Sequence, residues 1–324
     1  MLPYLDIIYI FISIVCYSAY IILIKGVSRK NILVSLFWIH TVTYVGFFCI
    51  YLFRKFILEH DLFAVEELIH EFTFINAPLY LLMGLSFLGS FLIFNILIIN
   101  YPISRVLPFA KISMFFILIG YAILGDPFTW KSMLAASIVA VGALLAALDE
   151  MPWPNPIKPF LDVPKKLWIG ILCESLLLTL NALITFFLTQ KTTIDETIME
   201  SLKHVFPFSF HNPFYFNLGA RFFIMITFFF YIYVIKEYRE HFFKVLSEQG
   251  NYIFLLGILY LASAYAYQDA YLLTKDKDVL AALSKLSIPL VIFLSSYTLN
   301  EKIDAPQIIG SALIVAGGVI SFLF

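Results

Sequence analysis

Long apolar runs recur along the whole chain and limit its possible folds more than any other feature. Several of them reach the roughly 20 residues that cross a hydrocarbon core of about 30 Å as a helix. Charged residues make up only 13% of the sequence, about half of the share that soluble domains use. Because a lone strand in lipid would leave its backbone groups unpaired, each run must be helical. The sequence therefore predicts an all-α integral membrane protein.

Polar residues, glycine and proline divide the apolar runs into ten predicted spans. The spans cover residues 6–25, 32–53, 78–100, 103–124, 130–148, 167–189, 215–235, 252–274, 279–299 and 305–324. A proline-rich stretch at 151–166 falls between spans five and six, and we take it as a linker. The predicted halves are therefore residues 1–150 and residues 167–324.

The last two spans of each half share residues at matching positions. Lys111 matches Lys285 at a spacing of 174 residues, and a serine follows each lysine two positions later. Gly142 matches Gly317 at a spacing of 175 residues. Because five spans reverse the direction of the chain, two homologous halves must lie upside down relative to each other. This predicts two inverted five-helix repeats, a plan in which secondary transporters place the substrate site near the midplane.

Five ionisable side chains fall inside the predicted spans, where they are costly and face a bundle interior or a wet cavity. They are Lys111, Glu174, Arg221, Asp269 and Lys285. Lys111 lies seven residues after Ser104 and Lys285 seven residues after Asp278, or about 10 Å from each helix start, so both approach the midplane from opposite faces. We predict that both lysines bind substrate. The alternative is that each lysine pairs with Glu174 or Asp269 and only locks the bundle.

Glu174 and Arg221 leave further alternatives open. Glu174 is predicted to bind a ligand or a proton, or else to form a structural pair with a cation. Arg221 lies near the start of its span, from which its side chain could instead reach the interface.

Neutral polar residues add three further candidates for substrate binding: Asn95, Tyr265 and Gln268. Hydrogen bonds between helices and interfacial aromatic belts are the alternative roles for such side chains. The three intramembrane cations outnumber the two acids by one, and an organic anion would supply the missing charge. Paired lysines suit phosphate or carboxylate, whereas a zwitterion would use a lysine and an acid together.

Other function classes fit the sequence less well. The net charge of −1 argues against a nucleic-acid partner. The chain contains no GxxxxGK loop, which favours a carrier driven by an ion gradient or by exchange. A membrane-embedded enzyme acting on lipid is one alternative, but the chain has no HExxH or GxSxG motif and its histidines are scattered. A scaffold or receptor bundle is another. We expect no enzymatic activity, cofactor or metal.

The terminal hairpins also carry a resemblance to a known family. The lysine-bearing helix, the turn at 299–301, Gly310 and the glycines at 317–318 resemble the drug/metabolite transporter superfamily, in particular its EamA-like branch. This resemblance implies a ten-helix, inverted-repeat carrier that moves a small metabolite by alternating access. The stretch 280–289 is similar to the lysine motif of nucleotide-sugar and triose-phosphate carriers, whose paired lysines contact phosphate.

The same resemblance bears on other candidate residues. Arg221 matches an arginine often found in the seventh span of such proteins, and His40 lies near the equivalent point of the first half. Glu174 looks like the buried glutamate of small multidrug-resistance proteins, which binds protons or cations. Tyr17 replaces the acid at the equivalent first-half position, which puts proton coupling by that route in doubt.

The expected partners are a small metabolite, the lipid bilayer and a coupling proton or ion, with the chain as a monomer or homodimer. We expect the cell membrane, with an organelle membrane as the alternative. The count of loop lysines and arginines favours both termini outside, whereas the resemblance implies cytoplasmic termini. The orientation therefore stays open.

Overall fold

The computed structural model describes residues 5–27, 32–56, 77–123, 130–148, 151, 162–189, 213–273 and 284–323. These residues form α-helices and no strand. In chain order, the helices are α1 (Leu5–Ile24), α2 (Ile32–Phe56), α4 (Ala77–Asn100), α5 (Ile103–Ala110), α6 (Ser113–Ile123), α7 (Trp130–Ala146), α9 (Lys165–Thr189), α11 (Pro213–Val234), α12 (Lys236–Leu273), α14 (Ser287–Leu299) and α15 (Ala305–Leu323).

Within the described part of the chain, five helices are long and apolar enough to cross a membrane: α1, α2, α4, α9 and α12. Shorter apolar segments of 10–17 residues occur in α7, α11, α14 and α15. The prediction of an all-helical, membrane-compatible protein is therefore confirmed for the described residues.

Helices occupy the predicted spans wherever the structure describes them, with two differences. The span at 103–124 is divided into α5 and α6 by a break at Lys111 and Ile112. The segment before residue 252, which we expected to be a loop, is the first part of α12. The predicted span at 279–299 is described only from Ser284 onward, and most of the proline-rich linker lies outside the described residues.

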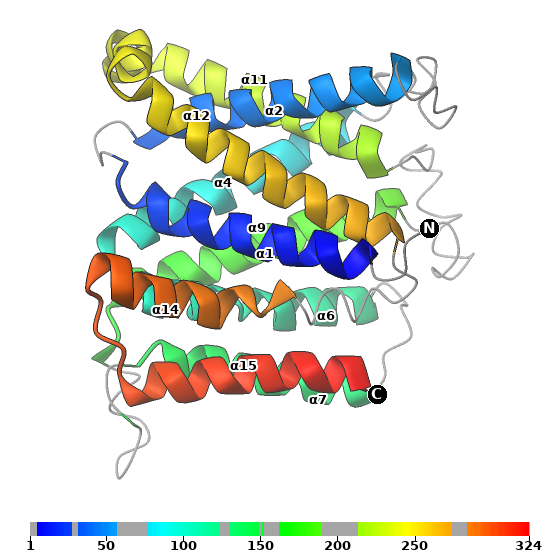
Figure 1. Cartoon of the computed structure of the whole chain (residues 1–324), viewed down its shortest axis with the longest axis vertical. Helices are drawn as coiled ribbons and strands as arrows, with labels where there is room; N and C mark the ends of the chain where they lie inside the picture. The colour runs from blue at the N-terminus through cyan, green and yellow to red at the C-terminus, as the bar shows by residue number, and fades with distance from the viewer. Residues whose placement is uncertain are drawn as a thin grey trace.

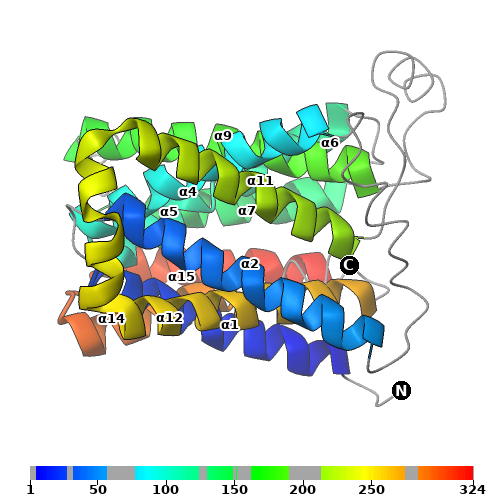
Figure 2. The same ribbon diagram turned by 90° about the horizontal axis from the view of Figure 1, so that it is seen from above.

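Most of the helices lie side by side along a common direction (Figure 1). The first part of α12 differs, because it crosses one end of the bundle before the helix kinks at Gln249 (φ −128°, ψ 17°) and turns into the bundle (Figure 2). The start of α1 and the end of α15 lie at the same end of the bundle, opposite the kink of α12 (Figure 1).

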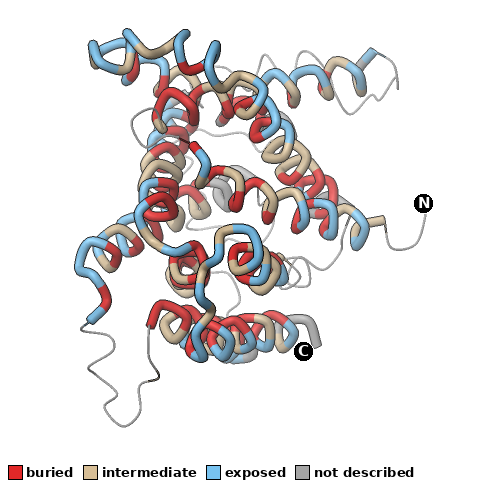
Figure 3. The backbone as a smooth tube through the Cα atoms, turned by 60° about the vertical axis from the view of Figure 1, so that its left-hand side comes forward, coloured by how far each residue is buried: buried red, intermediate tan, exposed pale blue. Residues whose placement is uncertain are grey.

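Two groups of helices account for much of the packing. In the first, here called the α1 group, α1 and α2 pack on α12, and α14 packs on α1. In the second, the α4 group, α9 and α11 pack on α4, and α6 packs on α9. Buried residues lie on the faces where helices meet, and exposed faces turn outward (Figure 3). Large apolar side chains such as Phe11 and Phe293 are exposed on these outer faces, as contact with lipid requires.

A third unit is the tight pair of α7 and α15, which meet through glycine. A Cβ atom on Gly142 would lie 2.6 Å from the carbonyl oxygen of Gly310, and one on Gly310 would lie 2.6 Å from the backbone nitrogen of Ala146. At the other contact, a Cβ on Gly317 would lie 2.8 Å from the carbonyl oxygen of Ala135. The small residues of the two helices thus form a close-packed seam.

Candidate functional site

A cavity of about 150 Å³ lies inside the bundle between helices of both halves. Its polar lining consists of Lys111, Glu174, Ser90 and Ser113. Six aromatic side chains form much of the remaining wall: Tyr17, Tyr20, Phe87, Phe91, Phe94 and Tyr260. The cavity therefore combines one cation and one acid with an aromatic surround.

Lys111 reaches the cavity because the helix is broken at this residue. The backbone N–H of Lys111 donates to the carbonyl of Pro108 at 3.0 Å, which is a tightened last turn. The Ser113 hydroxyl donates to the carbonyl of Ala110 at 2.8 Å and so satisfies one of the carbonyls that the break leaves free. The lysine side chain lies over the ring of Tyr17, with 6.0 Å between Nζ and the ring centroid.

The second lysine lies at an equivalent break. The Ser287 hydroxyl donates to the carbonyl of Ser284 at 2.8 Å, which is the same hydrogen bond one repeat later. Lys285 is buried, and its Nζ donates to the Ser284 hydroxyl at 3.4 Å. It does not line the cavity but lies within electrostatic range of Lys111. The structure therefore brings both predicted lysines to one region, with only Lys111 facing the cavity.

Glu174 is also buried and lines the cavity, and its carboxylate forms only long hydrogen bonds. It accepts long hydrogen bonds from the hydroxyls of Ser90 and Ser175, both at 3.5 Å. Its charge attracts that of Lys111 across the cavity. Within the described residues, however, neither Lys111 nor Lys285 forms an ion pair with a carboxylate. The alternative in which each lysine is locked in a pair is thus not what the structure shows.

Asp269 has a different environment from the one predicted for a substrate ligand. It forms an ion pair with Arg54 of α2, with 2.7 Å between the carboxylate and the guanidinium. The ring of Tyr265 lies beneath the same guanidinium, 5.0 Å from its central carbon. Neither Asp269 nor Tyr265 lines the cavity. Arg54 is not among the residues predicted from the sequence, although an acid inside a span indicates that a cation lies near it.

Arg221 is buried behind the aromatic wall of the cavity. Its guanidinium packs on the rings of Phe47 and Tyr260, at 4.7 and 5.3 Å from their centroids. In the described part of the chain, its Nε and Nη1 atoms have no hydrogen-bond partner. Since Tyr260 lines the cavity and also covers Arg221, this ring separates the guanidinium from the cavity. The histidine at the equivalent first-half point, His40, packs against Tyr260 as well.

The two candidate amides are buried but do not line the cavity. The side-chain nitrogen of Asn95 donates to the carbonyl of Phe91 at 2.7 Å, one turn earlier in α4. The side-chain nitrogen and oxygen of Gln268 have no hydrogen-bond partner among the described residues. Both amides therefore lie outside the site as the structure shows it.

Most of the aromatic wall is likewise absent from the residues predicted from the sequence. Phe87, Phe91 and Phe94 lie on α4 at a spacing of four and three residues, which places them on one face of the helix. That spacing was the available signal, but in a span that is apolar on every side it does not distinguish a cavity face from a lipid face.

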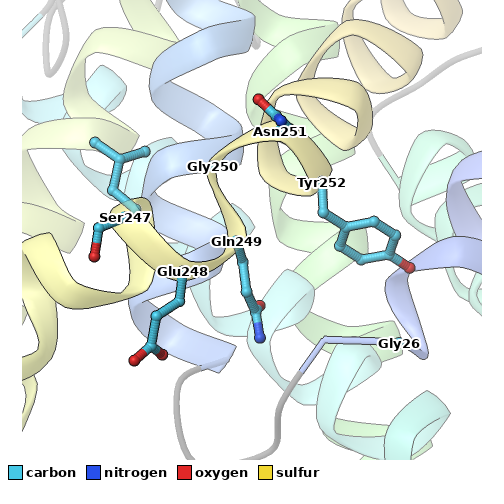
Figure 4. Close-up of a pocket in the computed structure, with 8 residues that line it drawn as sticks. Gly26, Ser247, Glu248, Gln249, Gly250, Asn251 and Tyr252 are labelled. Carbon is cyan, nitrogen blue, oxygen red and sulfur yellow. The ribbon is translucent and has the colours of Figure 1, made fainter.

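A second and larger hollow lies at the end of the bundle, beside the kink of α12 (Figure 4). It measures about 600 Å³, is open to the outside, and is lined by Gly26 and by residues 246–252. Figure 4 shows the ring of Tyr252 directed toward Gly26. Although this hollow is larger, it contains none of the intramembrane ionisable residues. The smaller cavity, which Lys111 and Glu174 line, is therefore the better candidate for a site.

Comparisons with known proteins add no further information on the site. No protein-family model matches the chain, and no curated protein matches it significantly. Among the described residues, no group of three or more histidine, cysteine, aspartate or glutamate side chains could hold a metal ion. Any functional argument therefore depends on the chemistry of the cavity itself.

Proposed function

We propose that the protein is a secondary carrier that moves a small polar metabolite across the membrane by alternating access. One observation carries this proposal. Lys111 and Glu174 line the same cavity with opposite charges, and neither is paired with another described side chain at ion-pair distance. Unpaired charges inside a membrane are costly, so a bound substrate is the simplest source of their missing partners.

The charge pattern favours a zwitterion as the substrate class. A carboxylate on the substrate would pair with Lys111, and an ammonium group would pair with Glu174. The aromatic wall would then pack against an apolar body, and a cavity of about 150 Å³ limits that body to a small molecule. An organic anion is the second candidate, because Lys285 adds a second amine within electrostatic range of Lys111.

The packing of the helices supports a pair of inverted five-helix repeats. At the repeat spacing of 175 residues, Gly142 corresponds to Gly317, and Ala135 corresponds to Gly310. The contact between Gly142 and Gly310 therefore has a counterpart in the contact between Gly317 and Ala135. The packing of α1 on α12 likewise corresponds to that of α9 on α4. Such a twofold relation gives a carrier two equivalent ways to open.

Ten membrane crossings and membership of the EamA-like branch belong to this proposal as well. Helices at the predicted spans support the first, and the sequence of the terminal hairpins supports the second. Glu174 is the candidate site for a coupling proton, because it is the carboxylate that lines the cavity.

The test is counterflow into proteoliposomes that contain the purified protein. Labelled amino acids, monocarboxylates and sugar phosphates represent the zwitterion and anion classes. We expect saturable uptake of at least one class, and loss of that uptake in Lys111→Gln. Lys236→Gln is the control, because Lys236 is an exposed lysine outside the cavity. A folded Lys111→Gln variant with unchanged uptake, or no saturable uptake of any class by the native protein, would contradict the proposal.

A further inference from the structure

Glu301 connects segments of the chain that meet at one end of the bundle. It lies in the short connection between α14 and α15 and forms an ion pair with Lys25, which directly follows α1. Its two carboxylate oxygens also accept hydrogen bonds from the backbone N–H groups of Ile103 and Ser104, at 3.0 and 3.1 Å. Ile103 and Ser104 are the first two residues of α5.

The hydrogen bonds from α5 to Glu301 supply an N-terminal cap that the neighbouring residues of α5 do not provide. The residue before α5 is Pro102, and its side chain provides no capping hydrogen bond. A helix start with unsatisfied N–H groups is stabilised by a carboxylate, both through hydrogen bonds and through the helix dipole. Glu301 supplies that carboxylate from the other half of the sequence, so α5 depends on a distant segment for its cap.

The same contacts tie the two groups of helices together. Lys25 extends from α1, and Glu301 follows α14, so both belong to the α1 group. Lys25 also donates to the carbonyl of Tyr101 at 3.5 Å, in the turn that follows α4 of the α4 group. The α5 helix then runs from the Glu301 carboxylate to Lys111 in about two turns, or roughly 12 Å. A movement at Glu301 would therefore reach the lysine that lines the cavity.

We propose that Glu301, together with Lys25, is a latch that holds this end of the carrier closed and must release for the cavity to open there. The proposal rests on the proposed carrier function. The side chain of Glu301 is 9% exposed and that of Lys25 is 24% exposed, so the contact is more protected than a surface ion pair but lies at the edge of water. The open hollow beside Gly26, the residue after Lys25, gives water access to the same end (Figure 4).

Accessibility of a cysteine in the cavity tests the latch directly. Cys16, Cys49 and Cys173 are free thiols in the structure and are first replaced by serine or alanine. Ser90, which lines the cavity, is changed to cysteine as the reporter. The protein is placed in lipid nanodiscs, and the rate of reaction with a membrane-impermeant thiol reagent is measured. We expect Glu301→Gln to raise this rate by about tenfold, because charge-assisted hydrogen bonds are roughly twice as strong as neutral ones.

Two further variants make the result specific. Lys25→Met removes the ion pair but keeps the cap on α5, so it should raise the rate by a smaller factor. It also provides the test if Glu301→Gln does not fold. Glu248→Gln is the matched control, because Glu248 is an exposed acid of the hollow at the same end and pairs with Lys244 at 3.8 Å. This control should leave the labelling rate unchanged.

An unchanged labelling rate in folded Glu301→Gln and Lys25→Met would overturn the latch. So would an equal increase in Glu248→Gln, because the effect would then be a general one of surface charge. The labelling measurement needs no substrate. Absence of counterflow by the native protein would therefore remove the carrier proposal without deciding whether the latch exists.

Discussion

At the scale of single residues, the opposite charges of the cavity determine which substrates can bind. Lys111 and Glu174 both line it, and Ser90 is the cavity residue that donates to the carboxylate of Glu174. Lys111 would pair with the carboxylate of either an anion or a zwitterion. Glu174 would pair only with the ammonium group of the zwitterion and would repel the anion. The two substrate classes therefore respond differently to loss of the acid.

We expect Glu174→Gln to reduce uptake of a zwitterion by roughly 10- to 100-fold, since a hydrogen bond to a charged group contributes about 1.5–3 kcal/mol. Uptake of the matching anion, an amino acid without its amino group, should be kept or increased. Counterflow of the two compounds in parallel measures this difference. Glu240→Gln serves as the control, because its side chain is exposed outside the cavity. An equal loss for both compounds would assign Glu174 a structural role.

Glu301 should give the protein a specific loss of stability in acid. Burial raises the pKa of its carboxyl, but the hydrogen bonds from Lys25, Ser104 and Ile103 outweigh burial and leave the pKa below its ordinary value. Because the folded state then binds the proton less readily than the unfolded state, this carboxylate stabilises the protein fully above the ordinary glutamate pKa of about 4.3. The stabilisation is lost as the pH falls through the lowered folded pKa.

We therefore expect the melting temperature of the native protein in detergent to fall more than that of Glu301→Gln as the pH is lowered from 5 to about 2.5, because the stabilisation is lost below the ordinary glutamate pKa. Among the described residues, Lys25 is the charged side chain that forms an ion pair with Glu301. Glu248→Gln, which removes an exposed acid, should follow the native pH profile. Parallel profiles for the native protein and Glu301→Gln would show that the carboxylate contributes nothing to stability.

The sequence predicted some of the site residues and not others, for a physical reason. The cost of a charge in lipid identifies Lys111, Glu174 and Lys285 as residues that must face inward. The same rule identifies Asp269 and Arg221 but cannot tell which inward environment each one meets. Asp269 is satisfied by Arg54 near the end of α2, and Arg221 lies behind the ring of Tyr260. These differences depend on helix rotation and on partners from distant helices, which residue spacing does not contain.

At the scale of elements, the pair of α7 and α15 depends on glycine at its points of contact. An added Cβ on Gly310 would come within 3 Å of backbone atoms of α7, including the carbonyl of Gly142 and the nitrogen of Ala146. Backbone atoms cannot move aside as a flexible side chain can. The two helices would have to separate along the seam.

We expect Gly310→Ala to destabilise the protein by about 1–3 kcal/mol, the usual cost of forcing extra atoms into a packed interface. Gly219→Ala is the matched control in α11, where the nearest described atoms to the added Cβ would be ring atoms of Tyr80 at 3.5 Å, an ordinary contact distance. That change should leave stability unchanged or raise it by up to about 1 kcal/mol, because alanine favours a helix more than glycine does. Thermal unfolding in detergent compares the two. Similar stabilities for both variants would mean that the seam tolerates separation.

The element boundaries show where the length of an apolar run stops being informative. The length of each run predicted the helices of the spans, because a helix is the only structure in which a single segment in lipid satisfies its own backbone hydrogen bonds. It did not indicate the break at Lys111, which depends on the serine and carbonyl bonds around that residue. It also missed the first part of α12, although Tyr238, Phe242 and Val245 recur at helical spacing among exposed charges. The period of 3.6 residues was the signal available there.

At the scale of the whole molecule, the two groups of helices are the bodies that alternating access would move. The α1 group and the α4 group correspond under the proposed repeat, since α1 and α2 on α12 match α9 and α11 on α4. The cavity lies between them, with Tyr17 from one group and Glu174 from the other among its lining residues. Movement of one group against the other would open the cavity without unfolding either.

This arrangement predicts that the position of a cross-link decides its effect. Ser13 of α1 and Ser263 of α12 lie within the α1 group, with 3.3 Å between their hydroxyl oxygens. A disulfide between cysteines at these positions should leave counterflow unchanged. Tyr44 of α2 and Phe222 of α11 lie in different groups, with 6.0 Å between their ring centroids. A short bismaleimide cross-link between cysteines at these positions should stop counterflow.

Both double-cysteine proteins are made without the three native cysteines, and each is compared with itself before and after cross-linking. This comparison separates the effect of the tether from any effect of the substitutions. If both tethers stop transport, helices within the α1 group must also move against each other, because the tether between Ser13 and Ser263 joins only α1 and α12. If neither tether stops transport, then transport does not require one group to move against the other. Loss of transport with the tether between groups alone is the outcome that a carrier built from two rocking units requires.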